Sequence, residues 1–552
     1  MPYFLPSPGP TVAFGTVALA QASRPATAPA YITTAFFNSN QVAGSGALYS
    51  PNGTSSGDVV ITLADGSTQV GYDIDVTTVR ASMLYDLTVS NAMTWLEPLL
   101  ERGFPSVVID PGTYALDGIS PTILLSADLS LTFENARFTA SLASGATADR
   151  MIFINTGGHD LFINGDWELD GLTIVPTGLY MLNGTTTYSK LRIDEGMRIV
   201  NCKQTLANGL GCQGAYIGGA YDNPRIIRPY IYNMNRVAGG GVPGNIGTHG
   251  LTIAYNTVDV LGTPTKFWPR LPYIDNPHIE RIISEEAFAS ANNQDCDCLR
   301  VFTYDIATTG TQTIYSGNAC TINGGVYKDF RGRAIKTQSG YTTIIGSVLA
   351  SVNGAVATGL KDANFQIIGI QGCQGFNIDT VEVEMLGSGA NDPFQGLWGG
   401  AVITLFSPAN VSRAIYRGNV NNIVLRFAGA EPGITSGFDT LIQGAAFDGV
   451  PSLPFMLNVN NIVSNGAVQY FMEVPEDVSS NFHSININNV ALGDIGIAVF
   501  VAEATEADLA LIIINIQNFF SGGSTKPMTR VRGTSDPLDV TVNRSDTVFG
   551  VT

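Results

Sequence analysis

The sequence predicts an all-β protein in which most of the chain winds into a parallel β-helix, a solenoid of stacked coils. Three observations lead to this prediction. Only 13% of the 552 residues are charged and 61 are glycine, a composition that favours sheet over helix. Short apolar strands alternate with turn residues from about residue 120 onwards. Similar strand segments also recur at irregular intervals, without helical stretches between them.

Two sets of segments suggest the repeat. Four of them share a β-branched residue, a polar residue, Asn and an apolar residue, and they begin at Val420, Val459, Ile487 and Ile516. A second set, with a shorter interval, contains Ile322, Ile344 and Ile367. Because one coil cannot bury its apolar face alone, stacked coils would share a continuous core. Asn at corresponding positions predicts stacked side-chain amides at a corner with left-handed backbone. The alternative fold is an array of β-sandwiches.

The chain divides into four predicted parts. Residues 1–75 are rich in Pro, Ala, Ser, Thr and Gly and form a separate N-terminal module. Residues 76–103 contain a helix over 90–102, with Ser90 as its N-cap and Gly103 after its C-terminus, which covers the open end of the first coil. Residues 104–520 form the β-helix, and residues 521–552 form a short C-terminal β cap.

The entry into the β-helix carries a recognisable pattern. A short helix, a glycine and an apolar strand are followed by Pro-Gly-x-Tyr, and the matching residues are Val107, Ile109, Pro111, Gly112 and Tyr114. This pattern resembles the start of the right-handed parallel β-helix in bacteriophage tailspikes and pectate-lyase-like proteins.

That resemblance implies a function. A tailspike of this kind would bind a bacterial surface polysaccharide, depolymerise it by hydrolysis of glycosidic bonds, and form a homotrimer. It would be made in the host cytoplasm and reside in the virion, docked to the phage tail through residues 1–75. Two alternatives stay open: an adhesive tail fibre without catalysis, and a secreted polysaccharide lyase. The apolar run 11–20 has no preceding basic residue, which argues against a signal peptide and hence against the lyase.

Composition excludes several other classes. A net charge of −18 argues against nucleic acid as a partner. No run of about 18 apolar residues occurs, so membrane insertion is not expected. Six cysteines are too few for a disulfide scaffold and are expected to be buried thiols. Nucleotide, metal and catalytic-triad motifs are absent from the sequence, so neither a cofactor nor a metal is predicted. The four histidines show no ligand spacing and are expected at ordinary surface or turn positions.

The densest group of carboxylates lies between residues 285 and 297. Glycoside hydrolysis needs a protonated acid and an ionised carboxylate on either side of the scissile bond. Residues i and i+2 of a strand share a face and lie about 7 Å apart. Asp295 and Asp297 are therefore the predicted catalytic pair, with Glu286 as a reserve acid. The alternative is an acidic, solvated turn before the strand at 299–302.

Basic and aromatic residues supply the predicted substrate contacts. Arg331, Arg333 and Lys336 follow about one coil later and are predicted to approach the carboxylates, although a surface ion-pair network is the alternative. Aromatic rings stack on sugar faces, and a guanidinium holds hydroxyl or carboxylate groups in a fixed fork. On these grounds the further predicted sugar-binding residues are Tyr232, Arg236, Trp268 and Trp398, for each of which a core or loop position is the alternative.

Overall fold

The structure of the chain is a computed structural model. It describes residues 11–25, 27–36, 46–117, 122–141, 150–204, 211–236, 247–284, 296–304, 316–353, 366–386, 400–406, 417–428, 438, 440–445, 456–473, 483–502, 512–522, 527–531, 540–545 and 548–549.

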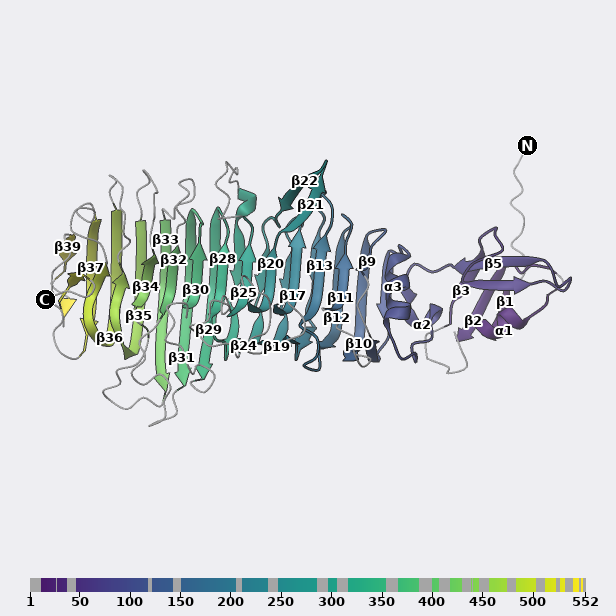
Figure 1. Cartoon of the computed structure of the whole chain (residues 1–552), viewed down its shortest axis with the longest axis horizontal. Helices are drawn as coiled ribbons and strands as arrows, with labels where there is room; N and C mark the ends of the chain where they lie inside the picture. Colours follow the sequence, from purple (N-terminus) through teal and green to yellow (C-terminus); the bar gives the residue numbers. More distant parts are fainter. Residues whose placement is uncertain are drawn as a thin grey trace.

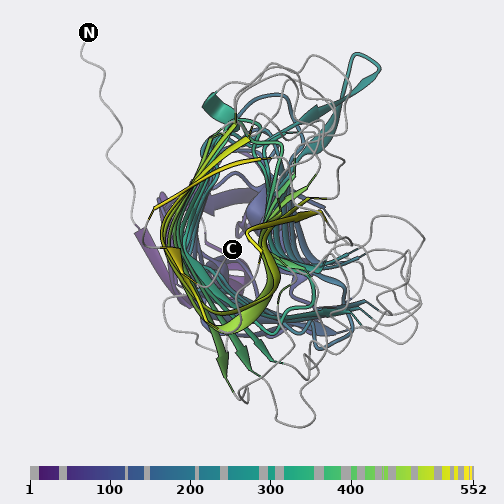
Figure 2. The same cartoon turned by 90° about the vertical axis from the view of Figure 1, so that its left-hand side faces the viewer.

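The molecule is a long column of stacked coils with a small domain at its N-terminal end (Figure 1). In the described ranges, 33 strands join one continuous network, and every strand pair in it is parallel. Viewed down the long axis, the coils superpose around a common interior (Figure 2). The prediction of an all-β parallel β-helix is therefore confirmed, and the sandwich array is excluded.

Strand pairing divides the wall of the column into three sheets. The first sheet contains β6 (Val79–Arg80), β7 (Ser106–Ile109), β14 (Leu191–Ile193), β18 (Arg225–Ile227), β23 (Tyr273–Asp275), β26 (Cys320–Asn323) and β39 (Thr541–Arg544). The second contains β8 (Gly112–Asp117), β15 (Met197–Val200), β16 (Lys203–Gln204), β19 (Tyr230–Arg236), β24 (His278–Ser284), β27 (Gly325–Lys328) and β40 (Val548–Phe549).

The third sheet faces a separate side of the column. It contains β9 (Thr122–Leu124), β11 (Arg150–Asn155), β13 (Thr177–Asn183), β17 (Cys212–Gly219), β20 (Thr248–Ala254), β25 (Cys296–Phe302), β28 (Arg333–Gln338), β30 (Gln366–Gln371), β32 (Ala401–Phe406), β34 (Thr440–Ala445) and β38 (Thr529–Val531). Longer strands continue around a corner and join more than one sheet: β10 (Leu129–Ser141), β12 (Leu161–Asp170), β29 (Thr342–Asn353), β31 (Gly375–Leu386), β33 (Arg417–Ala428), β35 (Met456–Glu473), β36 (His483–Ala502) and β37 (Ile512–Ser521).

One apolar core runs through the whole column, from Val79 to Met528. Equivalent core positions are separated by very different lengths of chain. Ile226 pairs with Ile274, 48 residues later, whereas Ile322 pairs with Ile345, 23 residues later. The six cysteines are all buried free thiols, as expected.

The repeat proposed for Ile322, Ile344 and Ile367 is wrong. Ile344 points outward with 44% of its surface exposed, and its neighbour Ile345 occupies the core position. Ile367 belongs to β30 in the third sheet. Loops of unequal length leave successive coils, so equal spacing in the sequence does not identify equivalent positions.

The Asn-containing segments, by contrast, lie in register. Val420 pairs with Val459, which pairs with Ile487, and Ile487 pairs with Ile516. The corner Asn residues have positive φ angles of 51°, 58° and 50° and form an amide ladder in which each Nδ2 donates to the Oδ1 of the coil before it: Asn461, Asn489 and Asn518. A second ladder on the outer face joins Asn419, Asn458, Asn486, Asn515 and Asn543 over 2.8–2.9 Å. The predicted amide stacking is confirmed.

The N-terminal end of the column is closed by helix α3 (Met93–Glu101), which follows the short α2 (Ala81–Leu84) (Figure 1). Trp95 is 1% exposed and packs edge-on against Tyr114 at 5.2 Å. Gly103 follows the helix with φ 76°, as predicted. Ser90 as N-cap is wrong: the N-cap is Ala92, and the side chain of Asn91 accepts a hydrogen bond from the Met93 amide.

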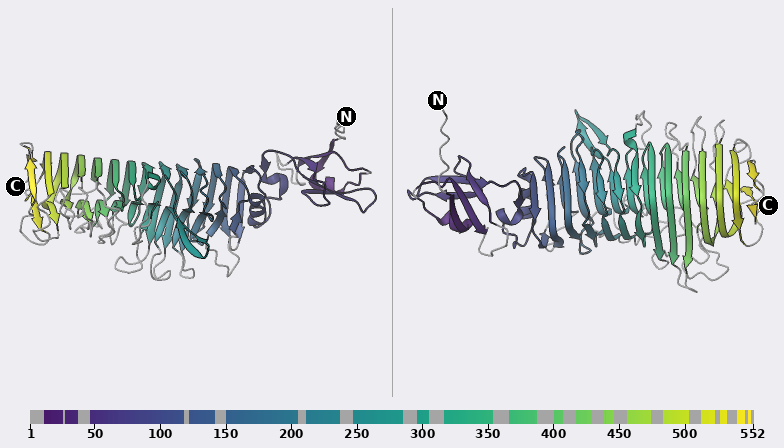
Figure 3. Two further views of the ribbon diagram at one scale, coloured as in Figure 1. Left: turned by 90° about the horizontal axis from the view of Figure 1, so that it is seen from above. Right: turned by 180° about the vertical axis from the view of Figure 1, so that it is seen from behind.

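The small N-terminal domain has a sheet and a core of its own. Its five-stranded sheet contains β1 (Thr11–Thr16), β2 (Tyr31–Phe36), β3 (Leu48–Pro51), β4 (Val59–Thr62) and β5 (Gln69–Ile74), with α1 (Val17–Ala22) packed on it. An ion pair between Asp58 and Arg102 joins this domain to the end of α3. At the opposite end, β38, β39 and β40 continue the parallel pairing of β36 and β37, so they lie on the last coils (Figure 3).

Candidate functional site

Three of the seven described residues of the predicted site, Asp297, Arg333 and Lys336, lie on the outward face of the third sheet. The strands from β11 to β34 in this sheet each turn two consecutive residues into the core, for example Cys298 with Leu299 in β25 and Ala334 with Ile335 in β28. This irregularity stacks from strand to strand, so the outward positions on either side of it are i and i+3.

In β20 the first of the two inward positions is Gly250. A Cβ at this position would lie 2.4 Å from the carbonyl oxygen of Cys298, so the close approach of β25 requires glycine.

A group of polar side chains occupies these outward positions on three adjacent strands. We call it the polar cluster: His249 on β20, Asp297 and Arg300 on β25, and Arg333 and Lys336 on β28. His249, Asp297 and Arg333 stand in one row of paired residues, and Arg300 and Lys336 in the next. Asp297 has no exposed surface, and His249, Arg333 and Lys336 are 2%, 5% and 7% exposed.

Short contacts link the members of the polar cluster. Arg333 Nε donates to Asp297 Oδ1 at 2.6 Å. Asp297 Oδ2 lies 3.6 Å from Arg300 Nε and 3.9 Å from His249 Nδ1. Arg300 Nη1 lies 2.6 Å from His249 Nε2. Because a guanidinium can only donate, Nε2 must be the acceptor, which places the imidazole proton on Nδ1.

Burial shifts the acid–base properties of this group. It lowers the pKa of His249 well below 6.5, and the nearby Arg300, Lys336 and Arg333 lower it further. Burial raises the pKa of Asp297, while Lys336 and Arg300 act in the opposite direction. Burial also lowers the pKa of Arg333 to about 10 and that of Lys336 well below its ordinary value. The polar cluster therefore combines a neutral imidazole with a carboxyl group that holds its proton more tightly than usual.

An aromatic row leads along the same sheet to the polar cluster. Phe153, Tyr180 and Tyr216 are half-buried and occupy the row of paired residues that continues through Thr252 to Arg300. The rings of Tyr180 and Tyr216 stack with centroids 4.9 Å apart and planes 10° apart. The face thus changes along the column axis from aromatic rings to hydrogen-bonding and charged groups.

The predicted residue Trp268 lies beside this row. It follows the projecting hairpin β21–β22 (Asn256–Val260 and Thr263–Phe267), seen at the side of the column in Figure 1. Its ring lies 4.7 Å from that of Tyr255, whose carbonyl accepts a hydrogen bond from the Tyr216 hydroxyl at 2.7 Å. Lys266 also packs on Tyr255, and its Nζ lies 4.6 Å from the centre of the Tyr255 ring.

The remaining predicted residues are dispersed. Arg331 donates to the carbonyl oxygen of Ser284 at the end of β24. Tyr232 and Arg236 belong to β19 in the second sheet, where Tyr232 is half-buried and Arg236 is 2% exposed. Three further predicted residues lie outside the described ranges: Glu286, Asp295 and Trp398. The proposed pairing of Asp295 with Asp297 therefore stays a prediction.

Sequence reasoning missed several residues of this face. His249 was expected at an ordinary surface or turn position, and this is wrong because it is buried within β20. The signal in the sequence for this buried position was Gly250, which follows His249 and permits close stacking of the coils. Arg300 was missed because it stands three residues after Asp297, outside the i and i+2 spacing that the prediction used. Tyr180 and Tyr216 were missed because their strands carry no charged or aromatic cluster that stands out in the sequence.

The described part of the chain contains no group of three or more His, Cys, Asp or Glu residues arranged to hold a metal ion. Nor do its helices include one long and apolar enough to cross a membrane. Comparison with known protein families finds no family model that matches this chain, and comparison with curated proteins finds no matching protein.

Proposed function

We propose that the chain is a bacteriophage tailspike that binds a bacterial surface polysaccharide along the outward face of the third sheet. The observation that carries this proposal is the continuous row that runs from Phe153, Tyr180 and Tyr216 through Thr252 to Arg300 and Lys336. Neighbouring members are one strand spacing apart, about 4.8 Å. A linear polymer lying along the column can therefore place successive sugar faces and hydroxyl groups against successive side chains.

Replacement of Tyr180 by Ala tests this surface. Wild-type protein is expected to be retained on immobilised polysaccharide of the host bacterium, and Tyr180→Ala is expected to bind at least tenfold more weakly. The matched control is Phe162→Ala, which removes a 37% exposed aromatic ring from the first sheet. Circular dichroism establishes that both variants keep the fold. Equal affinity of Tyr180→Ala and wild type would move the binding surface elsewhere.

Hydrolysis of the bound polymer is a second candidate activity. It is favoured by the raised pKa of Asp297, since a general acid must hold a proton near neutral pH. Asp297 has no exposed surface in this structure, so contact with a glycosidic oxygen requires the side chain to become accessible. Polymer length after incubation with wild type and with Asp297→Asn separates the two outcomes. Unchanged length with wild type leaves an adhesive tail fibre, and an unsaturated product would indicate a lyase instead.

Self-association into a homotrimer is the third part of the proposal. An outward row on the second sheet contains Val424, Val463, Ala491 and Phe520 on four successive coils, and Val463 and Phe520 are 52% and 54% exposed. An apolar stripe in register over several coils supports packing of the column against copies of itself. Light scattering after size exclusion is expected to give three times the chain mass for wild type and a smaller mass for Val463→Asp. A monomeric wild type would refute the trimer.

The N-terminal domain is the proposed attachment point on the phage tail. Its separate core and its position at one end of the column support this role. The test is detection of the chain in purified virions and its absence from particles of a phage that encodes it without residues 1–75. Normal incorporation of the shortened chain would assign attachment to another part.

A further inference from the structure

A separate groove lies on the second sheet near the N-terminal end of the column. It has a volume of about 200 Å³ and is lined by β10, β12 and β15. The charged residues of its lining are Arg137, Asp166, Glu168 and Arg198, and Asn135 stands at its edge on an exposed corner. None of these residues belongs to the proposed sugar-binding face on the third sheet, because their strands pair in a different sheet. Arg137, Glu168 and Arg198 stand in the outward row of the second sheet that reaches the proposed self-association stripe several coils later.

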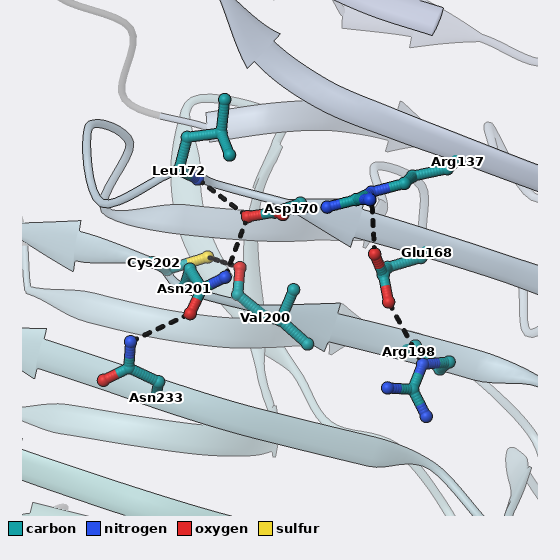
Figure 4. A network of polar contacts seen from close by, with 9 residues as sticks. All are labelled: Arg137, Glu168, Asp170, Leu172, Arg198, Val200, Asn201, Cys202 and Asn233. Carbon is teal, nitrogen blue, oxygen red and sulfur yellow. Dashed lines mark hydrogen bonds and ion pairs between the residues drawn. The ribbon is translucent and has the colours of Figure 1, made fainter. Parts of the chain in front are cut away.

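The two guanidinium groups are held by a shared carboxylate. Glu168 Oε1 accepts from Arg137 Nε at 2.9 Å, and Glu168 Oε2 accepts from Arg198 Nε at 3.1 Å (Figure 4). Arg137 is fixed a second time, through Nη2, by the buried Asp170 at 2.5 Å. Asp170 in turn accepts hydrogen bonds from the Leu172 amide and the Asn201 side chain, so this network is anchored in the corner of the coil.

Of the two arginines in the groove, Arg198 is the one whose two Nη atoms remain available to a ligand. Its guanidinium carbon lies 4.3 Å from the centre of the Tyr230 ring, and its Nε is held by Glu168. In Figure 4 the two Nη atoms point away from Glu168, and no interaction is drawn to them. The side chain is 49% exposed. Arg198 thus presents a fixed fork of N–H donors to solvent, which reduces the entropy lost when a ligand binds.

The charges of the groove select the class of ligand. Two guanidinium groups and two carboxylates line it, so their formal charges cancel. An anionic sugar would meet no excess of positive charge. Adjacent hydroxyl groups, which both donate and accept, match the N–H groups of Arg198 and the exposed carboxylate of Asp166. Beyond Arg198, the ring of Tyr230 continues the row towards His278 at 5.0 Å.

We propose that this groove is a second sugar-binding subsite, which takes a neutral, hydroxyl-bearing sugar unit and uses Arg198 and Asp166 as its specificity-determining residues. The inference rests on the proposed function, since it assumes a glycan ligand. It adds a contact on a different side of the column and names the chemical class of the sugar.

A printed array of bacterial capsular and O-antigen glycans tests the subsite. Wild-type protein is expected to bind at least one neutral glycan, with affinity that changes less than threefold between 50 and 500 mM NaCl. Arg198→Ala is expected to lose at least tenfold in affinity for that glycan. Arg198→Lys, which keeps the charge but not the fork, is expected to lose nearly as much. Arg192→Ala is the matched control, because Arg192 is 52% exposed and pairs with Asp194 on the first sheet.

The outcomes separate the two proposals. If wild type binds no glycan on the array, the proposed function fails and the subsite fails with it. If wild type binds and Tyr180→Ala weakens binding while Arg198→Ala does not, the function stands and the subsite is overturned. Binding confined to acidic glycans, or affinity that collapses with salt, would overturn the assignment of a neutral sugar.

Discussion

Replacing His249 by Gln tests whether the polar cluster holds a neutral imidazole. A glutamine side chain can still accept a hydrogen bond from Arg300, but it has no proton to gain. In the folded protein the pKa of His249 lies well below 6.5, whereas in the unfolded chain it returns to its ordinary value. The unfolded state therefore takes up a proton as the pH falls below 6.5 and the folded state does not. Stability that is present above pH 6.5 is lost with falling pH.

The magnitude follows from this linkage. Each pH unit below 6.5 removes about 1.4 kcal/mol per group while the folded state stays unprotonated. At pH 5.0 the loss due to His249 alone is about 2 kcal/mol relative to pH 8. Carboxylates that lie far from His249 also contribute to acid sensitivity, but they do so equally in both proteins, so their contribution cancels in the difference between wild type and His249→Gln.

Urea unfolding at pH 5.0, 6.0, 7.0 and 8.0, followed by tryptophan fluorescence, measures this difference. His249→Gln is expected to lose about 2 kcal/mol less than wild type between pH 8 and pH 5. A constant offset between the two proteins at all pH values is irrelevant. His159→Gln, at a partly exposed position, controls for a histidine-to-glutamine change outside the polar cluster. Parallel pH profiles for wild type and His249→Gln would refute a buried neutral imidazole.

Three further changes test other parts of the structure. Asn489→Ala should destabilise the protein by about 1–2 kcal/mol more than Asn489→Gly, because both lose the amide ladder but only Ala pays the left-handed backbone cost at φ 58°; equal urea midpoints would contradict this. Trp95→Ala should cost about 3–5 kcal/mol by opening the capped end of the core, measured as unfolding free energy. Arg333→Met should cost about 3–5 kcal/mol by leaving Asp297 without its nearest partner. The double variant Arg333→Met/Asp297→Asn should recover part of that loss. If the two single changes in unfolding free energy simply add in the double variant, the pairing of Arg333 with Asp297 is refuted.

The fold could be predicted from the sequence because similar strand segments repeat along the chain. Residues such as Val459 and Ile487 recur with the same neighbours, and an Asn at a corner reports both left-handed backbone and the amide that stacks there. Such local motifs can be recognised in the sequence even where the loops between them differ in length. The helix over the open end was also predictable, since apolar residues gather on one face of α3.

The site was only partly predictable, for two physical reasons. Arg333 contacts Asp297 across 36 residues, but the chain length per coil varies too much to calculate such contacts from spacing alone. The strands of the third sheet also break the alternation of inward and outward residues, so Asp297 shares its face with Arg300 at i+3. A rule that assumes i and i+2 cannot find that neighbour.

The unequal chain lengths between paired core positions have a consequence for how this molecule can change. Strands pair along the axis, whereas the intervening segments leave the column sideways, as the hairpin after Tyr255 does. An insertion between Ile226 and Ile274 therefore alters what one coil displays without shifting the hydrogen bonds of the next. Such excursions can therefore change one at a time, while the supporting wall keeps its geometry.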